Sequence, residues 1–243
     1  MTWSIIARDA SGAFGVAVAS KFFAVGALCP HAQSGIGALA TQALLNPLYV
    51  KPAFAALELG KQPEQIVEEL IAGDDGRDQR QLHIIDAHNR SFAHTGSACV
   101  PWCGHTAGDG YSVAGNMLAG PEVVESTAKA YEQGSHLSFG ERLLAALAAG
   151  DAAGGDKRGK QGAALVIYTT EDYPALDLRV DDHDEPIVEL RRLYEKSLER
   201  YQPFTACLAS RDNPAGLIDR ALLEAEVTRF HEALQSGRKG VAL

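Results

Sequence analysis

The order in which strand-like and helix-like segments follow one another limits the fold of this chain more than any other feature. Segments typical of strands come in groups, segments typical of helices come in pairs, and the two kinds alternate along the sequence. A doubly wound parallel sheet needs single strands and single helices in turn, so this order argues against it. Antiparallel hairpins separated by helix pairs instead predict an α+β fold in which stacked sheets are covered by helices.

The segments are identified by the spacing of their apolar residues. Strands are expected where apolar residues alternate with others or form short runs: Thr2–Arg8, Phe14–Ser20, Gly35–Thr41, Leu82–Asp86, Ser91–His94, Tyr111–Gly115, Ala163–Thr169 and Leu176–Val180. Helices are expected from Asn46 onward, from Pro63 onward, and over Pro121–Glu132, Ser138–Ala149, Pro186–Tyr201 and Pro214–Leu234. Because no repeat or flexible linker divides the 243 residues, we expect a single domain over residues 1–243.

The composition excludes several classes of partner. The chain has 22 basic and 31 acidic residues, a net charge of −9, which disfavours nucleic acid and anionic lipid. No apolar run approaches the roughly 18 residues of a membrane-spanning helix, and the first residues lack the pattern of a secretory signal. We therefore expect a cytoplasmic protein that acts on a small-molecule substrate, without a cofactor. An acidic surface covered by helices also permits a homo-oligomer.

The second residue carries the sharpest chemical feature of the sequence. Initiator methionine is normally removed when the next side chain is small, and Thr2 is small. Removal would leave a threonine whose α-amine, with a pKa of about 7.7–8.0, can accept the proton of its own hydroxyl. Ser4 shares the same strand face and could relay the proton. A small residue at the start of a buried first strand is the ordinary alternative.

The turn residues Asp9–Gly12 predict that the first two strands pair as a hairpin, which supplies neighbours for Thr2. In one register Thr2 faces Ala19, and Lys21 is a diagonal neighbour whose ammonium could lower the pKa of the α-amine. In the register slipped by one residue, Ser20 faces Thr2. Lys21 and Ser20 are therefore both candidate catalytic residues.

Several short segments form a specific set of motifs along the chain. They are residues 1–9 and 15–26, Ala40–Ala43, His94–Gly96, Gly115–Asn116, Leu118–Val123, Gly154–Gln161 and Leu178–His183. As a set they resemble the bacterial domain-of-unknown-function 1028 family, from residue 1 to about residue 200. That family is grouped with the N-terminal nucleophile hydrolases, whose members cleave amide bonds. The resemblance implies a four-layer αββα sandwich of two antiparallel sheets, and it implies almost nothing about the substrate.

Polar side chains at strand ends are candidates for the rest of an active site. Thr41 and Gln42 end one strand and Asn46 begins the next helix, and in this fold class such strand ends line the cleft, where they could orient a substrate carbonyl. A helix cap by Asn46, with Gln42 on the rim, explains them equally well. Asn116 could donate to an oxyanion or occupy a turn. His94 lies where a strand meets a loop, and a structural donor is its more ordinary role.

The segment Gly154–Gln161 is the loop that most resembles a binding site. Its paired glycines let a backbone approach a ligand closely, and Asp156 and Arg158 offer both signs of charge to a polar or zwitterionic group. The segment does not match the phosphate-binding pattern GxxxxGK[ST], so nucleotide binding is not expected. A solvated surface loop is the alternative.

Two clusters contain residue types that bind metals, but neither cluster is expected to hold a metal ion. The consecutive residues Asp181–Asp184 point to alternating sides of an extended chain and cannot converge on one ion. Asp182 or Asp184 is expected to cap the helix that follows. The segment Cys99–His105 lacks the spacing of a zinc site, so packing is the expected use of its cysteines.

These observations predict an N-terminal nucleophile hydrolase that cleaves an amide bond of a small polar metabolite. Thr2 would attack through its hydroxyl, Lys21 would tune the amine, and Asn116 or a backbone amide would hold the oxyanion. A second hypothesis is a non-catalytic protein that binds a small ligand on the same sandwich. A third, a metal-dependent hydrolase, would use the residues Asp181, Asp182 and His183.

Overall fold

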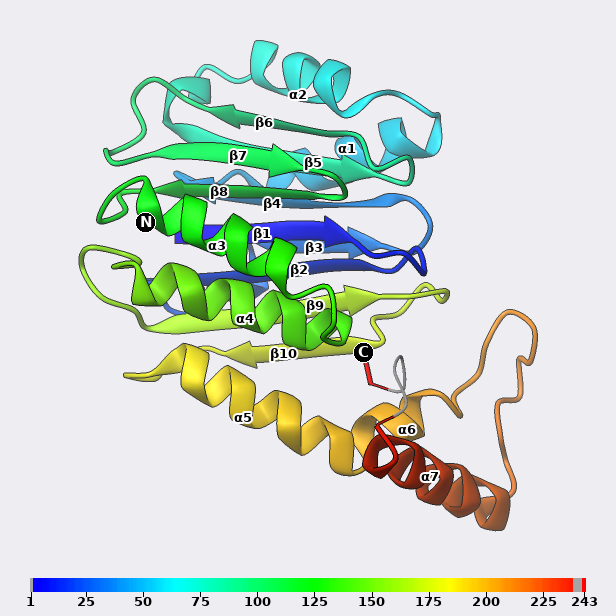
Figure 1. Ribbon diagram of the computed structural model, residues 1–243. Coiled ribbons are helices and arrows are strands. Elements are labelled where there is room, and N and C mark those ends of the chain that lie inside the picture. The colour runs from blue at the N-terminus through cyan, green and yellow to red at the C-terminus, as the bar shows by residue number, and fades with distance from the viewer. Residues whose placement is uncertain (1, 238–241) are drawn as a thin grey trace.

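A computed structural model describes residues 2–237 and 242–243, so Met1, whose removal the sequence predicts, lies outside the described residues. Two antiparallel sheets form the centre of the molecule (Figure 1). The six-stranded sheet consists, in spatial order, of β10 (Leu176–Val180), β9 (Gly162–Tyr168), β2 (Phe14–Ser20), β1 (Thr2–Arg8), β8 (Tyr111–Asn116) and β7 (Gly104–Gly108). The four-stranded sheet consists of β3 (Pro30–Gln33), β4 (Gly37–Ala43), β5 (Arg80–Asp86) and β6 (Ser91–Thr95).

Helices cover the outer face of each sheet. The six-stranded sheet is covered by α3 (Glu122–Gln133), α4 (Phe139–Ala152) and α5 (Pro186–Glu199). The four-stranded sheet is covered by α1 (Val50–Glu58) and α2 (Pro63–Ala72). At one corner lie the last two helices, α6 (Tyr201–Thr205) and α7 (Arg220–Gln235) (Figure 1). Single turns of 3-10 helix, η1 (Val25–Ala27), η2 (Pro47–Tyr49) and η3 (Arg77–Gln79), connect the strands and helices.

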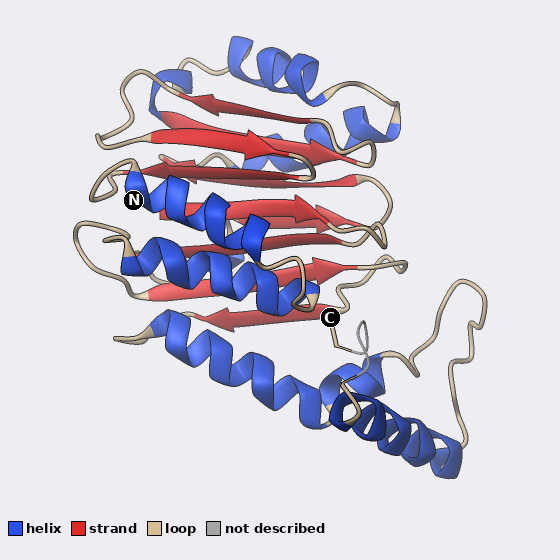
Figure 2. Cartoon of the chain, viewed as in Figure 1, coloured by secondary structure: helices blue, strands red, loops and turns tan. Residues whose placement is uncertain are grey.

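Three separate layers of apolar side chains hold these elements together, because successive residues of a strand point to opposite faces. On β1, Trp3 and Ile5 pack toward α3 and α4, whereas Ile6 packs between the two sheets. A third cluster, which includes Leu39 and Ile84, packs the four-stranded sheet against α1 and α2. The result is the expected four-layer αββα sandwich, with the strands enclosed between helices (Figure 2).

The sequence prediction omits two of the strands described above, β3 and β7. The predicted strand Gly35–Thr41 is the second half of a hairpin, and β3 before it was not predicted because it is only four residues long and begins with proline. The strand β7 was also not predicted, because its small residues alternate only between half-buried and exposed, as an edge strand allows.

The caps of the last helices also differ from the prediction. The helix α7 begins at Arg220 rather than at Pro214, because the Asp219 side chain accepts hydrogen bonds from Ala221 N and Leu222 N. The predicted cap of α5 by Asp182 or Asp184 is wrong, since the residue before that helix is Glu185 and it makes no side-chain cap. Proline at the first position of α5 needs no hydrogen-bond acceptor for a backbone N–H, so a cap contributes less there.

The hairpin of β1 and β2 has the second of the two predicted registers. Arg8 faces Phe14 and Trp3 faces Ala19, which places Thr2 opposite Ser20. The register with Ala19 opposite Thr2 is wrong because the turn closes one residue later than expected. Asp9 N donates to Ala13 O at 3.0 Å, and Ala13 N donates to Asp9 Oδ1 at 3.0 Å, so Ala13 belongs to the turn.

Candidate active site

The candidate site lies at the edge of the sandwich where β1 begins, which we call the Thr2 end. The neighbours of β1 end there, β2 at Ser20 and β8 at Asn116. In the other sheet β4 ends and β5 begins at the same edge, with Gln42 opposite Gln81. This edge is on the left in Figure 1, beside the label N. The antiparallel pairing therefore gathers polar side chains that are far apart in the sequence.

The Thr2 hydroxyl lies 3.1 Å from the Ser20 hydroxyl, and Thr2 is 6% exposed. Asn116, opposite Thr2 on β8, donates from Nδ2 to Thr2 O at 3.4 Å and to Gln81 Oε1 at 3.0 Å. An amide group has two hydrogens, so both donors of Asn116 are in use. The structure thus brings three of the predicted residues, Thr2, Ser20 and Asn116, into one hydrogen-bonded group.

Lys21 lies next to this group in sequence, but its side chain is exposed. Its ammonium donates to Lys160 O at 3.4 Å, and its backbone N–H donates to Asp156 Oδ2 at 3.0 Å. The hydrogen-bond partner of the ammonium is therefore the Gly154–Gln161 loop rather than an atom of Thr2.

Behind Thr2, the buried side chain of Gln81 ties the two sheets together. Its Oε1 accepts from Gln42 Nε2 at 2.8 Å as well as from Asn116. Its Nε2 is shared among Thr95 Oγ1, Gly104 O and Gly115 O, at 2.9 to 3.1 Å. Gln81 belongs to the four-stranded sheet, whereas its partners Gly104, Gly115 and Asn116 belong to the six-stranded one. Gln81 therefore fixes the distance between the sheets below Thr2.

A second chain of hydrogen bonds continues the network through His83. Ser4 Oγ donates to Gln42 Oε1 at 2.6 Å and lies 2.9 Å from His83 Nε2, while His83 Nδ1 lies 3.1 Å from Ser112 Oγ. Since the Ser4 hydrogen goes to Gln42, His83 donates from Nε2 and accepts at Nδ1. Burial, and secondarily His105, lowers the pKa of His83 to about 3. His83 is therefore a neutral structural link, because a general base needs a pKa near the working pH.

The residues Gln81 and His83 were not among the predicted site residues. The signal for them is local: both occupy alternate positions of β5, among the apolar residues Leu82, Ile84 and Ile85. Alternate positions of a strand share one face, so two polar residues there indicate a polar contact on that face. The sheet pairing then shows that this face points at β1 and β8.

Thr41 and Asn46 are used to shape the loop after β4. Thr41 Oγ1 accepts from Asn46 N at 3.0 Å, and Asn46 Oδ1 accepts from Leu48 N at 3.1 Å as the cap of η2. Asn46 Nδ2 also donates to Asp74 Oδ2 at 3.2 Å. Gln42, in contrast, is buried within the network described above and does not lie on a rim.

His94 occupies β6, at the edge of the four-stranded sheet. Its Nε2 donates to Arg77 O at 2.9 Å, and its described contacts do not include Thr2, Ser20 or Asn116. The structure therefore gives His94 a partner in the preceding η3 turn and keeps it apart from the hydroxyl pair.

The Gly154–Gln161 loop is held against the Thr2 end by Asp156. The Asp156 carboxylate is fully buried and accepts from Lys21 N at 3.0 Å and from Arg158 N at 2.8 Å. Arg158 Nη2 contacts this carboxylate at 3.4 Å and Lys21 O at 3.3 Å. On the other side, Asp156 forms a β-bridge with Leu118, just after β8. The loop thus joins the two strands that flank β1.

Left-handed backbone conformations gather at the same end. Ala24, Ala43 and Met117 have φ angles of 52°, 66° and 60°, and they follow or end β2, β4 and β8. Such angles cost roughly 1–2 kcal/mol in residues other than glycine, and they concentrate at functional sites. The positive φ near Asn116 belongs to Met117, so Asn116 itself remains in the strand. The backbone strain therefore marks the Thr2 end independently of its side chains.

The acidic cluster after β10 does not converge. Asp181 pairs with Arg179 at 3.0 Å, Asp182 accepts from Gln161 Nε2 at 3.0 Å, and His183 Nδ1 accepts from Glu185 N. Among the residues that the structure describes, no group of three His, Cys, Asp or Glu side chains could hold a metal ion. Within the same residues, none of the helices has the length and apolar character needed to cross a membrane.

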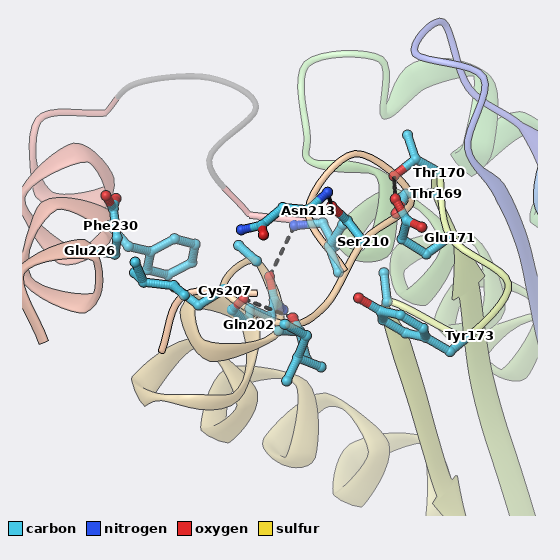
Figure 3. Close-up of a pocket in the computed structure, with 16 residues that line it drawn as sticks. Thr169, Thr170, Glu171, Tyr173, Gln202, Cys207, Ser210, Asn213, Glu226 and Phe230 are labelled. Atoms are coloured by element: carbon cyan, nitrogen blue, oxygen red, sulfur yellow. Dashed lines mark hydrogen bonds between the residues drawn. The ribbon is translucent and has the colours of Figure 1, made fainter. Parts of the chain in front are cut away.

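A cavity of about 490 Å³ lies at the opposite end of the sandwich. Figure 3 shows Glu226 and Phe230 of α7 on one side of it and Tyr173, from the loop after β9, on the other. Because β9 runs away from Ser20, the residues that follow it are remote from Thr2. This cavity is therefore separate from the candidate active site.

Fold and site together define a class: αββα sandwich proteins with a threonine at the start of a central strand and a buried polar network beneath it. The chain belongs to DUF1028, a family of unknown function, which matches residues 2–190. Among curated proteins, none matches this chain.

The solved structures that match this chain include the following two. Protein SPO2555 from Silicibacter pomeroyi, of the same family, is 30% identical, with a TM-score of 0.84 over 90% of this chain and 96% of that one. Anbu (ancestral beta-subunit) from Yersinia bercovieri is 16% identical, with a TM-score of 0.36 over 81% of this chain and 94% of that one.

Proposed function

We propose that this protein is an N-terminal nucleophile hydrolase that cleaves an amide bond of a small polar metabolite, with Thr2 as nucleophile after removal of Met1. The observation that carries the proposal is the position of Thr2. It is the first residue of a central strand, and its hydroxyl lies 3.1 Å from the buried Ser20 hydroxyl. The sandwich architecture and the resemblance to a family grouped with these hydrolases agree with it.

The chemistry needs one residue and one water. Thr2 Oγ1 attacks the amide carbon while its proton moves to the Thr2 α-amine, which has a pKa of about 7.7–8.0 as a free amine. The carbon–nitrogen bond then breaks, and that proton passes to the leaving amine. Water attacks the resulting ester, gives a proton to the α-amine, and releases the acid as the proton returns to Thr2 Oγ1. Free acid and free enzyme remain.

The neighbours of Thr2 position this nucleophile. Ser20 fixes the direction of the hydroxyl, and Asn116 holds the Thr2 carbonyl. Because both Asn116 hydrogens already have acceptors, a backbone amide is the better donor to the oxyanion. Lys21 remains a proposed electrostatic neighbour that favours the neutral amine.

The test combines mass spectrometry with a matched substitution. Intact mass of the purified protein establishes whether Met1 is absent, and a panel of small amides is then screened for hydrolysis. Thr2→Val keeps the shape of the side chain and removes the hydroxyl, so we expect kcat/KM to fall by about 10³-fold or more. Thr2→Ser keeps the hydroxyl and should retain turnover. Full activity of Thr2→Val would disprove the proposal.

A second candidate function, binding without catalysis, is favoured by one observation. Within the described residues, the side chains that hydrogen-bond to Thr2 are a hydroxyl and an amide, and neither is a base. If the intact mass shows that Met1 is retained, Thr2 lacks the amine it needs, and ligand binding at this end becomes the better assignment.

A further inference from the structure

In the folded chain, the negative charge of the Gly154–Gln161 loop is buried, whereas some of its positive charge is not. The Asp156 carboxylate is fully buried, and hydrogen bonds from Lys21 N, Arg158 N and Arg158 Nη2 satisfy it. The negative charge that the sequence predicts for a zwitterionic ligand is therefore not presented to solvent. Lys160 is neutralised as well, since its ammonium lies 2.6 Å from Asp151 and 2.7 Å from Glu185.

Among the described residues, two ammonium groups at the Thr2 end have no carboxylate partner. Lys21 Nζ donates to Lys160 O at 3.4 Å, and Lys157 Nζ donates to Pro101 O at 2.8 Å. In the part of the chain that the structure describes, neither ammonium takes part in an ion pair. A carbonyl oxygen leaves the positive charge uncompensated, so both amines can attract an anion.

These two amines flank the start of β1. Lys21 directly follows Ser20, the partner of the Thr2 hydroxyl. Lys157 reaches Pro101, and the neighbouring Val100 O accepts from Met117 N, the residue after Asn116. One cation therefore lies on the β2 side of Thr2 and the other on the β8 side.

The net charge of the rest of the molecule makes this local positive charge selective for small anions over polyanions. The chain carries a net charge of −9, so a polyanion such as nucleic acid is repelled as a whole. A small molecule with one or two negative charges feels chiefly the two nearby lysines, since screening limits charge interactions to about 8 Å at physiological salt.

We propose that Lys21 and Lys157 form a binding site for a carboxylate of the substrate, so that the amide cleaved at Thr2 belongs to an anionic molecule. This inference rests on the proposed function, because it takes the bond that is cleaved to be an amide at Thr2. It replaces the zwitterionic ligand expected from Asp156 and Arg158 with an acidic one.

The test measures binding without turnover. In the Thr2→Val background, two probes are titrated and followed by NMR: N-acetylglycinate and its uncharged N-methylamide. We expect the anion to bind more tightly than the neutral probe. Lys21→Gln and Lys157→Gln should each weaken binding of the anion about three- to tenfold, which is the effect of losing one typical hydrogen bond. Binding of the neutral probe should not change.

Lys129→Gln is the matched control, because it removes the same charge from an exposed lysine on α3. Equal affinity for the two probes, no binding of either, or an equal loss in Lys129→Gln would overturn the inference. Failure of the proposed function looks different. Anion selectivity with no amide hydrolysis by the wild type would leave the carboxylate site standing, whereas hydrolysis that prefers neutral amides would remove only the site.

Discussion

The layer between the two sheets is polar at the Thr2 end and apolar at the other. The change runs along three of the strands that contribute to this layer: Thr2, Ser4 and Ile6 on β1, Ser20, Val18 and Val16 on β2, and Gln81, His83 and Ile85 on β5. The apolar half packs by shape alone. In the polar half, every contact also requires a donor to meet an acceptor.

The two halves of this layer differ in the free energy with which they hold the sheets together. Burial of apolar surface stabilises by about 25 cal/mol per Å² without directional requirements, whereas a buried polar group costs free energy unless it is paired. If every member of the network were replaced by a hydrophobic residue of similar size, the sheets would be held equally well, because no polar group would be left unpaired. A polar network directly behind Thr2 therefore points to a positional role, in which Gln81 and Asn116 fix the strand that begins with the proposed nucleophile.

Gln81→Leu tests this difference with the largest expected effect on stability. The substitution keeps the volume but leaves Gly104 O, Gly115 O and the amide of Asn116 without their partner in a buried site. We expect the free energy of unfolding to fall by about 3–5 kcal/mol, measured by urea denaturation. The exposed Gln133→Leu on α3 should change it by less than about 0.5 kcal/mol. Equal effects would mean that the network contributes no more than packing.

Local sequence patterns predicted the first hairpin and the layered fold, but not the polar network. The turn at Asp9–Gly12 and the alternation of β1 and β2 gave the hairpin, and with it the pair Thr2 and Ser20 as one of two registers. The order of hairpins and helix pairs gave a layered α+β sandwich. Both depend on residues close in sequence, where turn chemistry and periodicity act directly.

The network could not be predicted in the same way, because its partners are distant in the sequence. Ser4 and His83 are 79 residues apart, and Gln81 and Gly115 are 34 residues apart. Only the stacking of two sheets brings them together, and a single sequence does not state which strands lie opposite one another. The buried pairing of Asp156 has the same cause, since its partner Lys21 is 135 residues away.

The polar half should also make stability depend on pH. Burial lowers the pKa of His83 from 6.5 to about 3. At pH values between these two, the imidazole is protonated in the unfolded chain but not in the folded chain. The free energy of unfolding therefore falls as the pH falls below 6.5, by up to about 1.4 kcal/mol per pH unit from this group. His105 and His31, whose pKa values burial also lowers, act in the same direction. The pKa of Asp74, held down by Arg80 and Tyr49, contributes only below its ordinary value of 3.8.

Urea denaturation at a series of pH values between 6.5 and 4.5 measures this slope. His83→Gln should make the slope smaller, because one titrating group is gone while His105 and His31 remain. The exposed His88→Gln is the control and should leave the slope unchanged. A slope that stays the same in His83→Gln would show that the buried imidazole is not the source of the acid sensitivity.

The apolar half should respond least, and only through packing. Ile85 is fully buried on the same strand as Gln81 and His83 and contacts apolar side chains between the sheets. Ile85→Val removes one methylene, and we expect the free energy of unfolding to fall by about 0.5–1.5 kcal/mol at every pH from 6.5 to 4.5. Because no polar partner is lost, turnover at the distant Thr2 should stay at the wild-type value. A loss of turnover in Ile85→Val would show that the two halves are coupled, and that the position of Thr2 depends on the whole layer rather than on the polar network alone.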